Sequence, residues 1–308
     1  MPKQQTIQQA ASVSGVGLHT GAVVNMTFKP APENHGYVFQ RIDLKGKPLV
    51  AADVDHVVDT SRGTTIAVNG VRVHTVEHTL AALVGLEIDN ALIELDGPEP
   101  PAMDGSSKDF TKAIAEAGFT EQKAERKLFI IDEPIIYEEA DRKVYLSVVP
   151  SAQWEMKVKI DFDSANFSPQ EAYLKKLETF PKVFADCRTF CFLHEVEPLL
   201  QAGLIKGGTL NSAVVIVDRQ LSVEETERLG VLFERPGIQI TDEGVLNQGG
   251  FRYPNEPARH KLLDLLGDLA LVGLRIQGQV LAIRPGHKAN VELAKKIKRK
   301  FEQLRLLD

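Results

Sequence analysis

Apolar positions recur at helical spacing in two parts of the chain, and each run leads into a strand pattern. The first run ends in VGLEI at residues 84–88 and continues into a strand expected at 92–95. The second run ends in VGLRI at 272–276 and continues into a strand expected at 280–283. In both cases a loop with Pro and Gly follows, and then another amphipathic helix, expected at 107–117 and 288–304. This repeated helix–strand–loop–helix order predicts two related α+β halves.

Further strand patterns occur at residues 23–28, 144–149 and 154–160, as parts of local hairpins. Such hairpins favour mixed or antiparallel sheets with helices on one face. The charged stretch 121–127 is the best candidate for a linker between an N-terminal domain at 1–124 and a C-terminal domain at 127–308. Two domains also suit the length of 308 residues, because a single hydrophobic core rarely serves more than roughly 250–300 residues.

Composition narrows the class of protein. The net charge of −6 and the pI of about 5.8 argue against general nucleic-acid binding. Two cysteines are too few for a disulfide framework and suit a reducing compartment. No apolar run approaches the roughly 18 residues of a membrane-spanning helix, and residues 1–10 lack the apolar core of a signal peptide. These features predict a cytoplasmic protein without a membrane span.

Polar side chains interrupt the apolar helix of the second half at regular intervals. His260, Asp264 and Asp268 are spaced i, i+4 and i+8, so they share one helix face. An imidazole and a carboxylate four residues apart can offer two ligands to one metal ion. A third donor, His78, lies at the start of the apolar helix of the first half. Two imidazoles and one carboxylate, with a fourth position left for water, are typical of a catalytic zinc site. By themselves, His260 and Asp264 are equally compatible with a surface salt bridge.

Residues 74–78 allow a second interpretation. They read HTVEH, which matches the H-x-x-E-H motif of inverted zinc peptidases. A peptidase of that class would take its third ligand from a downstream glutamate, and it would leave His260 and Asp264 without a role. We therefore interpret His74 as a partly exposed residue at the start of the helix.

Cys187, Cys191 and His194 are three further potential ligands within eight residues. A closed structural zinc site needs four ligands, and no fourth lies nearby in the sequence. We interpret the cysteines as small buried thiols on either side of a functional threonine, Thr189.

Several motifs occur in an order and spacing that resembles the family of zinc-dependent UDP-3-O-acyl-N-acetylglucosamine deacetylases. They are SGVGLHTG at 14–21, TVEH at 75–78, IDN at 88–90, MDGS at 103–106, CRTF at 187–190, RHK at 259–261 followed by Asp264 and Asp268, and GH at 286–287. Enzymes of this family remove the acetyl group from UDP-3-O-acyl-N-acetylglucosamine in the committed step of lipid A synthesis in Gram-negative bacteria. The resemblance implies the same hydrolysis here, with zinc as cofactor and the acylated UDP-sugar as substrate.

The resemblance also implies an architecture. Two two-layer α/β sandwich domains are expected to enclose the active site between them, each with a small insert, at about 43–65 and about 193–218. The second insert combines an apolar helix, a glycine turn and an apolar strand, and is expected to line a passage for the 3-O-acyl chain. In some lineages the family is fused to a hydroxyacyl-carrier-protein dehydratase, so fusion to or association with such an enzyme is a further expectation.

Roles for single residues follow from the same resemblance. The implied zinc ligands are His78, His260 and Asp264. The implied catalytic groups are Glu77 as general base, Thr189 as the hydroxyl that stabilises the oxyanion, and His287 as a cationic group oriented by Asp268. The implied substrate contacts are Lys261, Leu18, His19, Phe162 stacked on the uracil, and Phe190 near the sugar. Either Glu77 or His287 protonates the leaving amine. A non-catalytic sugar-nucleotide binder, which would not need Glu77, is the remaining alternative.

Overall fold

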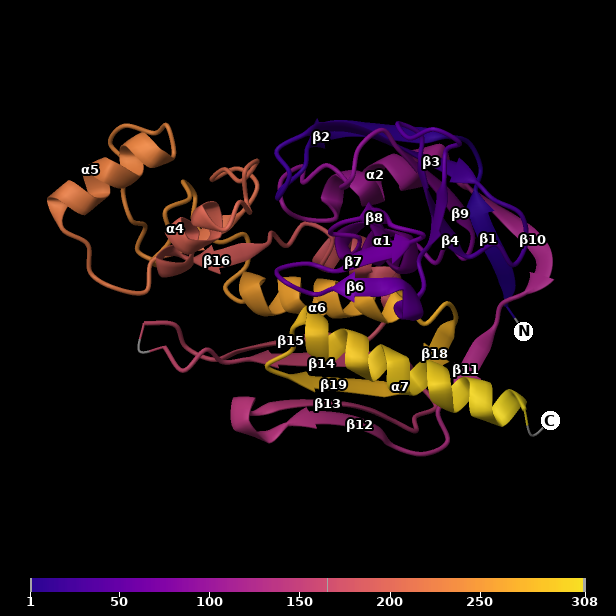
Figure 1. Cartoon of the computed structure of the whole chain (residues 1–308). Helices are drawn as coiled ribbons and strands as arrows, with labels where there is room; N and C mark the ends of the chain where they lie inside the picture. Colours follow the sequence, from indigo (N-terminus) through magenta and orange to yellow (C-terminus); the bar gives the residue numbers. More distant parts are fainter. Residues whose placement is uncertain (1, 165, 307–308) are drawn as a thin grey trace.

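The computed structural model describes residues 2–164 and 166–306. Helices fill the centre of the main body, and a five-stranded sheet lies on each side of them (Figure 1). Helices α1 (Glu77–Gly85) and α2 (Lys108–Ala117) come from the first half of the chain, and α6 (Glu256–Ala270) and α7 (His287–Arg305) come from the second. Because α1 packs against α6, the two halves meet through their helices. The predicted α+β class is confirmed.

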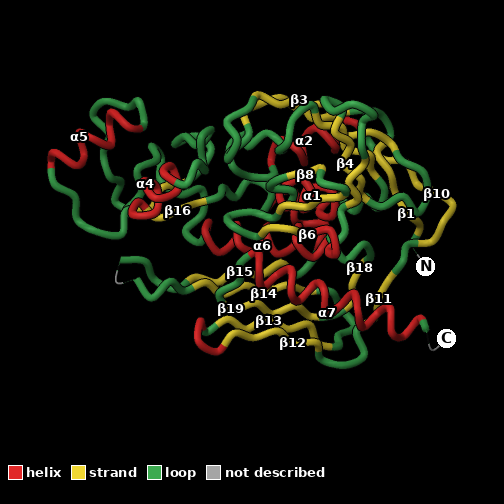
Figure 2. The backbone as a smooth tube through the Cα atoms, viewed as in Figure 1, coloured by secondary structure: helices red, strands yellow, loops and turns green. Residues whose placement is uncertain are grey.

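The two main sheets are built from well-separated parts of the chain. The first has the order β2-β3-β9-β4-β5, formed by Ala11–Val16, Val23–Pro30, Ala91–Leu95, Tyr37–Arg41 and Leu49–Ala51. The second has the order β12-β13-β19-β14-β15, formed by Ile135–Glu139, Val144–Val149, Gln279–Ile283, Glu155–Ile160 and Gln170–Leu174. The alternation of helix and strand along the chain can be followed in Figure 2.

Both sheets share one topology. In each sheet three neighbouring pairs of strands are antiparallel, and one pair is parallel: β4 with β9, and β14 with β19. The helix before the central strand is α1 in the first half and α6 in the second, and the helix after it is α2 or α7. The internal repeat predicted from VGLEI and VGLRI is therefore confirmed by the strand pairing.

The boundary between the halves differs in detail from the prediction. Residues 121–127 connect the halves, but most of them form a strand, β10 (Phe119–Glu125), because their backbone groups pair with β1 (Lys3–Ile7). The next strand, β11 (Leu128–Ile130), pairs in parallel with β18 (Arg275–Gln277). The largest cluster of buried apolar side chains draws on both halves, so the division into domains at 1–124 and 127–308 stays a prediction.

Each half carries a smaller unit. The first is a three-stranded sheet of β6 (Val57–Asp59), β7 (Thr65–Val68) and β8 (Val71–Val73), which continues past the predicted end at residue 65.

The second unit lies at one end of the molecule, around β16 (Phe190–Phe192), α4 (Leu193–Gln201), β17 (Val214–Ile216) and α5 (Val223–Leu232) (Figure 1). It contains its own small cluster of buried apolar residues, which includes Val215, Leu229 and Leu246. This unit therefore extends past the predicted end at residue 218.

The contact between α1 and α6 depends on Gly267. A Cβ atom at this position would lie 2.0 Å from the carbonyl oxygen of Glu77, far inside van der Waals contact. Every residue of α1 is buried, as expected for a short helix enclosed on all sides. The close crossing brings the first turn of α1, with Glu77 and His78, next to the face of α6 that carries Asp264 and Asp268.

Helix α7 covers the strands β12 and β13 of the second sheet. Leu293 and Ile297 are fully buried, whereas Lys288 and Lys296 are exposed, and Lys296 Nζ donates to the carbonyl oxygen of Ile136 in β12. None of the helices within residues 2–164 and 166–306 combines the length and the apolar character needed to cross a membrane.

Candidate active site

Two histidines and one aspartate form a buried cluster between α1 and α6. The Nε2 atoms of His78 and His260 lie 3.3 Å and 3.2 Å from the same oxygen, Oδ1 of Asp264. The two imidazole rings are nearly perpendicular, and their centroids are 4.9 Å apart. His78 belongs to the first turn of α1, and His260 and Asp264 lie one turn apart on α6. The structure thus brings together the three predicted metal ligands.

The arrangement of these donors is suited to a cation between them. The Nδ1 of His260 lies 3.0 Å from the carbonyl oxygen of Cys187, which can only accept, so in the neutral ring Nδ1 carries the proton and Nε2 presents a lone pair. Asp264 Oδ1 is buried and has no hydrogen-bond partner in the described part of the chain. A tetrahedral ion with bonds of roughly 2.0–2.1 Å separates its ligands by roughly 3.3–3.4 Å, close to the separations found here. The donor set fits one divalent metal ion.

The charges around Asp264 favour its role as a ligand. Lys261 Nζ donates to Asp264 Oδ2 at 2.8 Å, which leaves Oδ1 for the metal. Burial alone would raise the pKa of Asp264, but His260 and Lys261 hold it well below its usual range. Burial lowers the pKa of His78 and outweighs the opposing effect of Asp264. His78 is therefore kept neutral, the form of histidine that binds metals.

Glu77, Asp268 and His287 form a second cluster beside the first. His287 Nδ1 donates to Asp268 Oδ2 at 3.0 Å. On the other side of the ring, Nε2 lies 4.0 Å from Glu77 Oε1 and 3.9 Å from Asp264 Oδ2. Glu77 and Asp268 are buried, and 10% of the His287 side chain is exposed. A carboxylate and an imidazole thus lie next to the metal donors.

The pKa values in this cluster suit proton transfer near neutral pH. Burial raises the pKa of Glu77 to about 7, with His287 opposing the shift and Asp268 and Asp264 adding to it. Burial would lower the pKa of His287, but the carboxylates of Asp268 and Glu77 outweigh burial and raise this pKa to about 9. His287 is therefore protonated at neutral pH, and Glu77 can both accept and return a proton, as a general base must.

Thr189 and Leu18 lie in the wall next to His78. Together with Glu99 and Gly105, they line a narrow crevice that reaches His78. The backbone N–H of Thr189 donates to the carbonyl oxygen of Gly105 at 2.7 Å, so the CRTF and MDGS motifs meet here. Both predicted residues are thus placed beside a metal donor.

An aromatic row leads from the metal donors toward solvent. The rings of Phe190 and His260 have centroids 6.3 Å apart, and those of Phe162 and Phe190 are 5.8 Å apart. Lys261 Nζ lies 5.7 Å from the centroid of Phe190. Phe162, at the outer end, is 40% exposed. The three predicted substrate contacts therefore lie along one path. Lys261 offers a cation next to Phe190, and Phe162 offers an exposed aromatic surface.

His19 lies where the second insert meets the first half. Its backbone N–H donates to both carboxylate oxygens of Glu99, each at 3.1 Å. Its Nδ1 accepts from the backbone N–H of Ile205 at 3.4 Å, and the Gly207 N–H donates to the carbonyl oxygen of Leu18 at 3.0 Å. Burial lowers the pKa of His19, although Glu99 opposes the shift. His19 Nε2 is buried without a hydrogen-bond partner in the described residues, so it is available to a bound molecule.

Two buried residues near the clusters were not predicted from the sequence. The carboxylate of Glu99 also accepts from the hydroxyl of Thr75, which precedes α1. An acidic residue flanked by prolines in PEPP at 98–101 was a signal that could have identified it. Thr64 hydrogen-bonds to both Glu77 and Asp268. No local pattern marks Thr64, because its partners are distant in sequence.

The residues of the two alternative motifs do not join the clusters. The Nδ1 of His74 lies 3.0 Å from the hydroxyl oxygen of Thr65, outside the converging metal donors. This disagrees with an H-x-x-E-H peptidase site. Cys187 is buried, Cys191 is partly buried, and both thiols are free. Burial raises the pKa of both thiols, which agrees with their interpretation as small buried thiols on either side of Thr189, although Cys191 is buried only in part.

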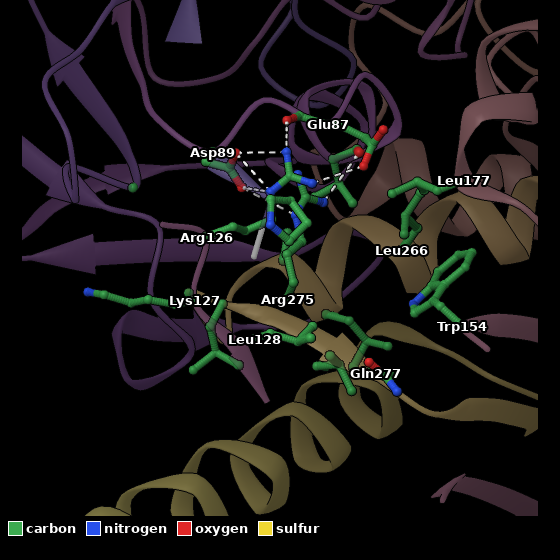
Figure 3. Close-up of a pocket in the computed structure, with 18 of the residues that line it drawn as sticks. Glu87, Asp89, Arg126, Lys127, Leu128, Trp154, Leu177, Leu266, Arg275 and Gln277 are labelled. Carbon is green, nitrogen blue, oxygen red and sulfur yellow. Dashed lines mark hydrogen bonds and ion pairs between the residues drawn. The ribbon is translucent and has the colours of Figure 1, made fainter. Parts of the chain in front are cut away.

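A larger cavity, of about 770 Å³, lies on the other side of α6 (Figure 3). Leu266 and Leu269 of α6 contribute to its wall, and they point away from the face that carries the metal donors. Trp154 lies at one side of the cavity, and the ion pair between Arg126 and Asp89 lies at another. No residue of the two clusters is among those that line it in the described part of the chain. The cavity is therefore separate from the candidate active site.

Comparison with known proteins agrees with this geometry. Residues 4–231 and 233–299 match the family described as UDP-3-O-acyl N-acetylglycosamine deacetylase (LpxC). The chain is 46% identical over 306 residues to the bifunctional enzyme LpxC/FabZ of Chlorobaculum tepidum, covering 98% of this chain and 66% of that protein. It is 43% identical over 301 residues to the bifunctional enzyme LpxC/FabZ of Bacteroides thetaiotaomicron, covering 98% of this chain and 65% of that protein.

A relative of more similar length is the UDP-3-O-acyl-N-acetylglucosamine deacetylase of Myxococcus xanthus, which is 38% identical over 295 residues, covering 96% of this chain and 86% of that protein. The chain thus spans about two thirds of the length of the bifunctional relatives and most of the length of the deacetylase. Matches of this identity and coverage show that the chain belongs to the UDP-3-O-acyl-N-acetylglucosamine deacetylase family.

Proposed function

We propose that this chain hydrolyses the N-acetyl group of UDP-3-O-acyl-N-acetylglucosamine, releasing acetate and UDP-3-O-acyl-glucosamine, as the committed step of lipid A biosynthesis in a Gram-negative bacterium. The observation that carries the proposal is the position of Glu77 and His287 beside three converging metal donors, in a member of a deacetylase family. A metal site alone would suit many functions. A base and a cationic imidazole next to it are what the hydrolysis of an amide requires.

Zinc is the metal we propose for the site. Its ligands would be His78, His260 and Asp264, because two imidazole nitrogens and one carboxylate oxygen in tetrahedral arrangement are a common donor set of catalytic zinc. When bound, zinc would polarise the acetamide carbonyl and lower the pKa of the attacking water to about 7.

The side chains around the site would carry out the remaining steps of the hydrolysis. Glu77 would take a proton from the water as its oxygen forms a bond to the carbonyl carbon. The negative charge that develops on the carbonyl oxygen would accept a hydrogen bond from the Thr189 hydroxyl. As the carbon–nitrogen bond breaks, the amine nitrogen needs a proton, which Glu77 or His287 would deliver. Asp268 would keep His287 protonated until then, in line with the pKa of about 9.

The substrate would lie along the path from the metal donors to the exposed phenylalanine. Phe162 would stack on the uracil, and Phe190 would lie near the sugar, next to Lys261. Leu18 and His19 would contact the substrate from the opposite wall, where His19 Nε2 has no partner among the described residues.

The relatives also suggest a partner for this chain. Two of them are named as bifunctional LpxC/FabZ enzymes. We therefore propose that this chain is fused to, or acts together with, a hydroxyacyl-carrier-protein dehydratase. The cytoplasm is the proposed location, in agreement with the reducing environment expected from two free cysteines.

Acetate release from the acylated UDP-sugar tests the proposal directly. The purified chain should release acetate when loaded with zinc, lose this activity after chelation, and regain it when zinc is returned. Metal-loaded protein that releases no acetate would contradict the proposal. Turnover of peptides would favour the peptidase, and binding of the substrate without release, unchanged in Glu77→Ala, would favour the non-catalytic binder.

The second insert gives a prediction about the acyl chain. Leu200 lies on α4 and is 38% exposed, whereas Val215 is buried in the small apolar cluster. Leu200→Glu should therefore reduce binding of the acyl chain without disrupting the insert. A buried methylene contributes roughly 0.8 kcal/mol, and an unpaired polar group on an apolar wall costs roughly 1–3 kcal/mol. The kcat/KM of a long-chain substrate should fall roughly 10-fold or more in Leu200→Glu, and that of a short-chain analogue by less than about 2-fold.

The control for this variant is Leu49→Glu, a similar change at an exposed leucine of β5 in the first sheet. It should leave both substrates unaffected. Equal losses for the long and the short substrate in Leu200→Glu would show that the insert has a structural role only.

A further inference from the structure

Thr64 connects the first insert to the group of residues proposed to transfer protons. It directly precedes β7 and is fully buried. Its backbone N–H donates to Glu77 Oε2 at 3.0 Å, and its carbonyl oxygen accepts from the N–H of Val76 at 3.2 Å. The backbone of Thr64 thus holds both the start of α1 and one oxygen of the Glu77 carboxylate. The other oxygen, Oε1, faces His287.

The side chain of Thr64 contacts Asp268, the hydrogen-bond partner of His287. Its hydroxyl donates to Asp268 Oδ1 at 2.5 Å, and the same hydroxyl oxygen lies 3.4 Å from His287 Nδ1. The second oxygen, Oδ2, accepts from His287 Nδ1 at 3.0 Å and from Asn290 Nδ2 at 2.8 Å. Asp268 is fully buried, so water does not replace a lost donor. The Thr64 hydroxyl therefore satisfies the oxygen that His287 leaves free, and it fixes the plane of the carboxylate.

These contacts join groups from both halves of the molecule. Glu77 is on α1 of the first half, and Asp268 and His287 are on α6 and α7 of the second. We propose that Thr64 is a positioning residue that sets the placement of Glu77 relative to His287, with its hydroxyl acting on His287 both through Asp268 and by direct contact. This inference rests on the proposed deacetylation, in which these two groups move the protons.

Mutation can separate the backbone contacts of Thr64 from the contacts of its hydroxyl. Thr64→Val keeps the shape of the side chain and both backbone contacts but removes the hydroxyl, and Thr64→Ser restores the hydroxyl. The neighbouring Thr65 offers a matched control. It is also buried, and its hydroxyl oxygen contacts His74, which lies outside both clusters. Thr65→Val therefore removes a buried hydroxyl of the same kind, one residue away.

Steady-state kinetics, metal analysis and thermal unfolding of the zinc-loaded chain provide the test. Thr64→Val should lower kcat by roughly 10- to 100-fold, the usual range for residues that orient the groups around a metal site. Its KM should change by less than about 2-fold, and its zinc content should stay complete, because no metal ligand is altered. Thr64→Ser should recover most of kcat. Thr65→Val should keep the wild-type kcat, whatever its effect on Tm.

A second readout does not depend on activity. In ¹⁵N-histidine NMR spectra, the Nδ1 signal of His287 should shift in Thr64→Val and stay unchanged in Thr65→Val. If the wild-type chain releases no acetate, the proposed function fails, and this signal still decides the positioning role. A wild-type kcat in Thr64→Val, or an equal loss of kcat in Thr64→Val and Thr64→Ser with the His287 signal unmoved, would overturn the inference.

Discussion

His260→Ala should remove the bound metal and the deacetylase activity together. His260 would supply one of the three proposed donors, and its Nε2 lies 3.2 Å from Asp264 Oδ1. Without it, the buried Asp264 and His78 cannot complete the coordination of the ion. A catalytic metal contributes several kcal/mol to the transition state, so activity should fall on the order of 10³-fold or more. Metal content by atomic absorption and acetate release by a coupled assay check both parts.

Glu77→Gln should separate metal binding from catalysis. The amide is nearly the same size as the carboxylate and leaves all three donors in place, so zinc content should stay complete. The loss of the base should lower kcat by roughly 10²- to 10⁴-fold. His74→Ala serves as the control, because His74 contacts Thr65 outside the donor cluster. Full metal content and activity in His260→Ala, or loss of metal in His74→Ala, would contradict the assignment of ligands.

The pH dependence of kcat/KM should be bell-shaped. Glu77 must be ionised to act as a base, and burial raises its pKa to about 7, so activity should rise with pH through this region. His287 must be protonated, and the Asp268 and Glu77 carboxylates, which outweigh the opposing effect of burial, raise its pKa to about 9. Activity should therefore fall again above this pH. A bound divalent cation favours the ionised form of Glu77, so the acidic limb of the metal-loaded chain should lie below this pKa of about 7.

His287→Ala should change both limbs of this profile. The basic limb should disappear, because the group that titrates there is gone, and kcat should drop by roughly 10²- to 10⁴-fold. The acidic limb should move to higher pH, because the positive charge of His287 lowers the pKa of Glu77 from 4.0 Å away. A basic limb that survives unchanged in His287→Ala would show that another group titrates there.

The sequence predicted the repeated architecture more reliably than the connections. Helical spacing of apolar residues predicted α2 and α7 nearly to their ends, and the similarity of VGLEI and VGLRI predicted two related α+β halves, which share one sheet topology. The stretch 121–127 has no apolar alternation, so its strand character was not predictable. Backbone pairing with β1, more than 110 positions earlier in the chain, creates that strand. Backbone hydrogen bonds are available to any residue except proline, and therefore leave little trace in the sequence.

Much of the candidate site could also be predicted, though from two different sources. The i, i+4 and i+8 spacing places His260, Asp264 and Asp268 on one face of α6 regardless of the rest of the fold, because helix geometry alone requires it. The inclusion of His78 in the same site was inferred from its residue type and its place at the start of the first apolar helix, whereas the roles expected for Thr189 and His287 depended on the family resemblance. Local patterns carry no information about which distant segments meet.

Only the tertiary structure decided how the donors and the proton-transferring groups come together. The absence of a side chain at Gly267 lets α6 approach the backbone of Glu77 so closely that His78 reaches Asp264. Thr64 then bonds to Glu77 and Asp268 from a loop with no marked pattern. The periodicity of a sequence determines which face of a helix is polar, since it depends on neighbouring residues alone. Contacts between faces depend on the packing of the whole chain, and so the meeting of α1, α6 and the Thr64 loop had to be observed.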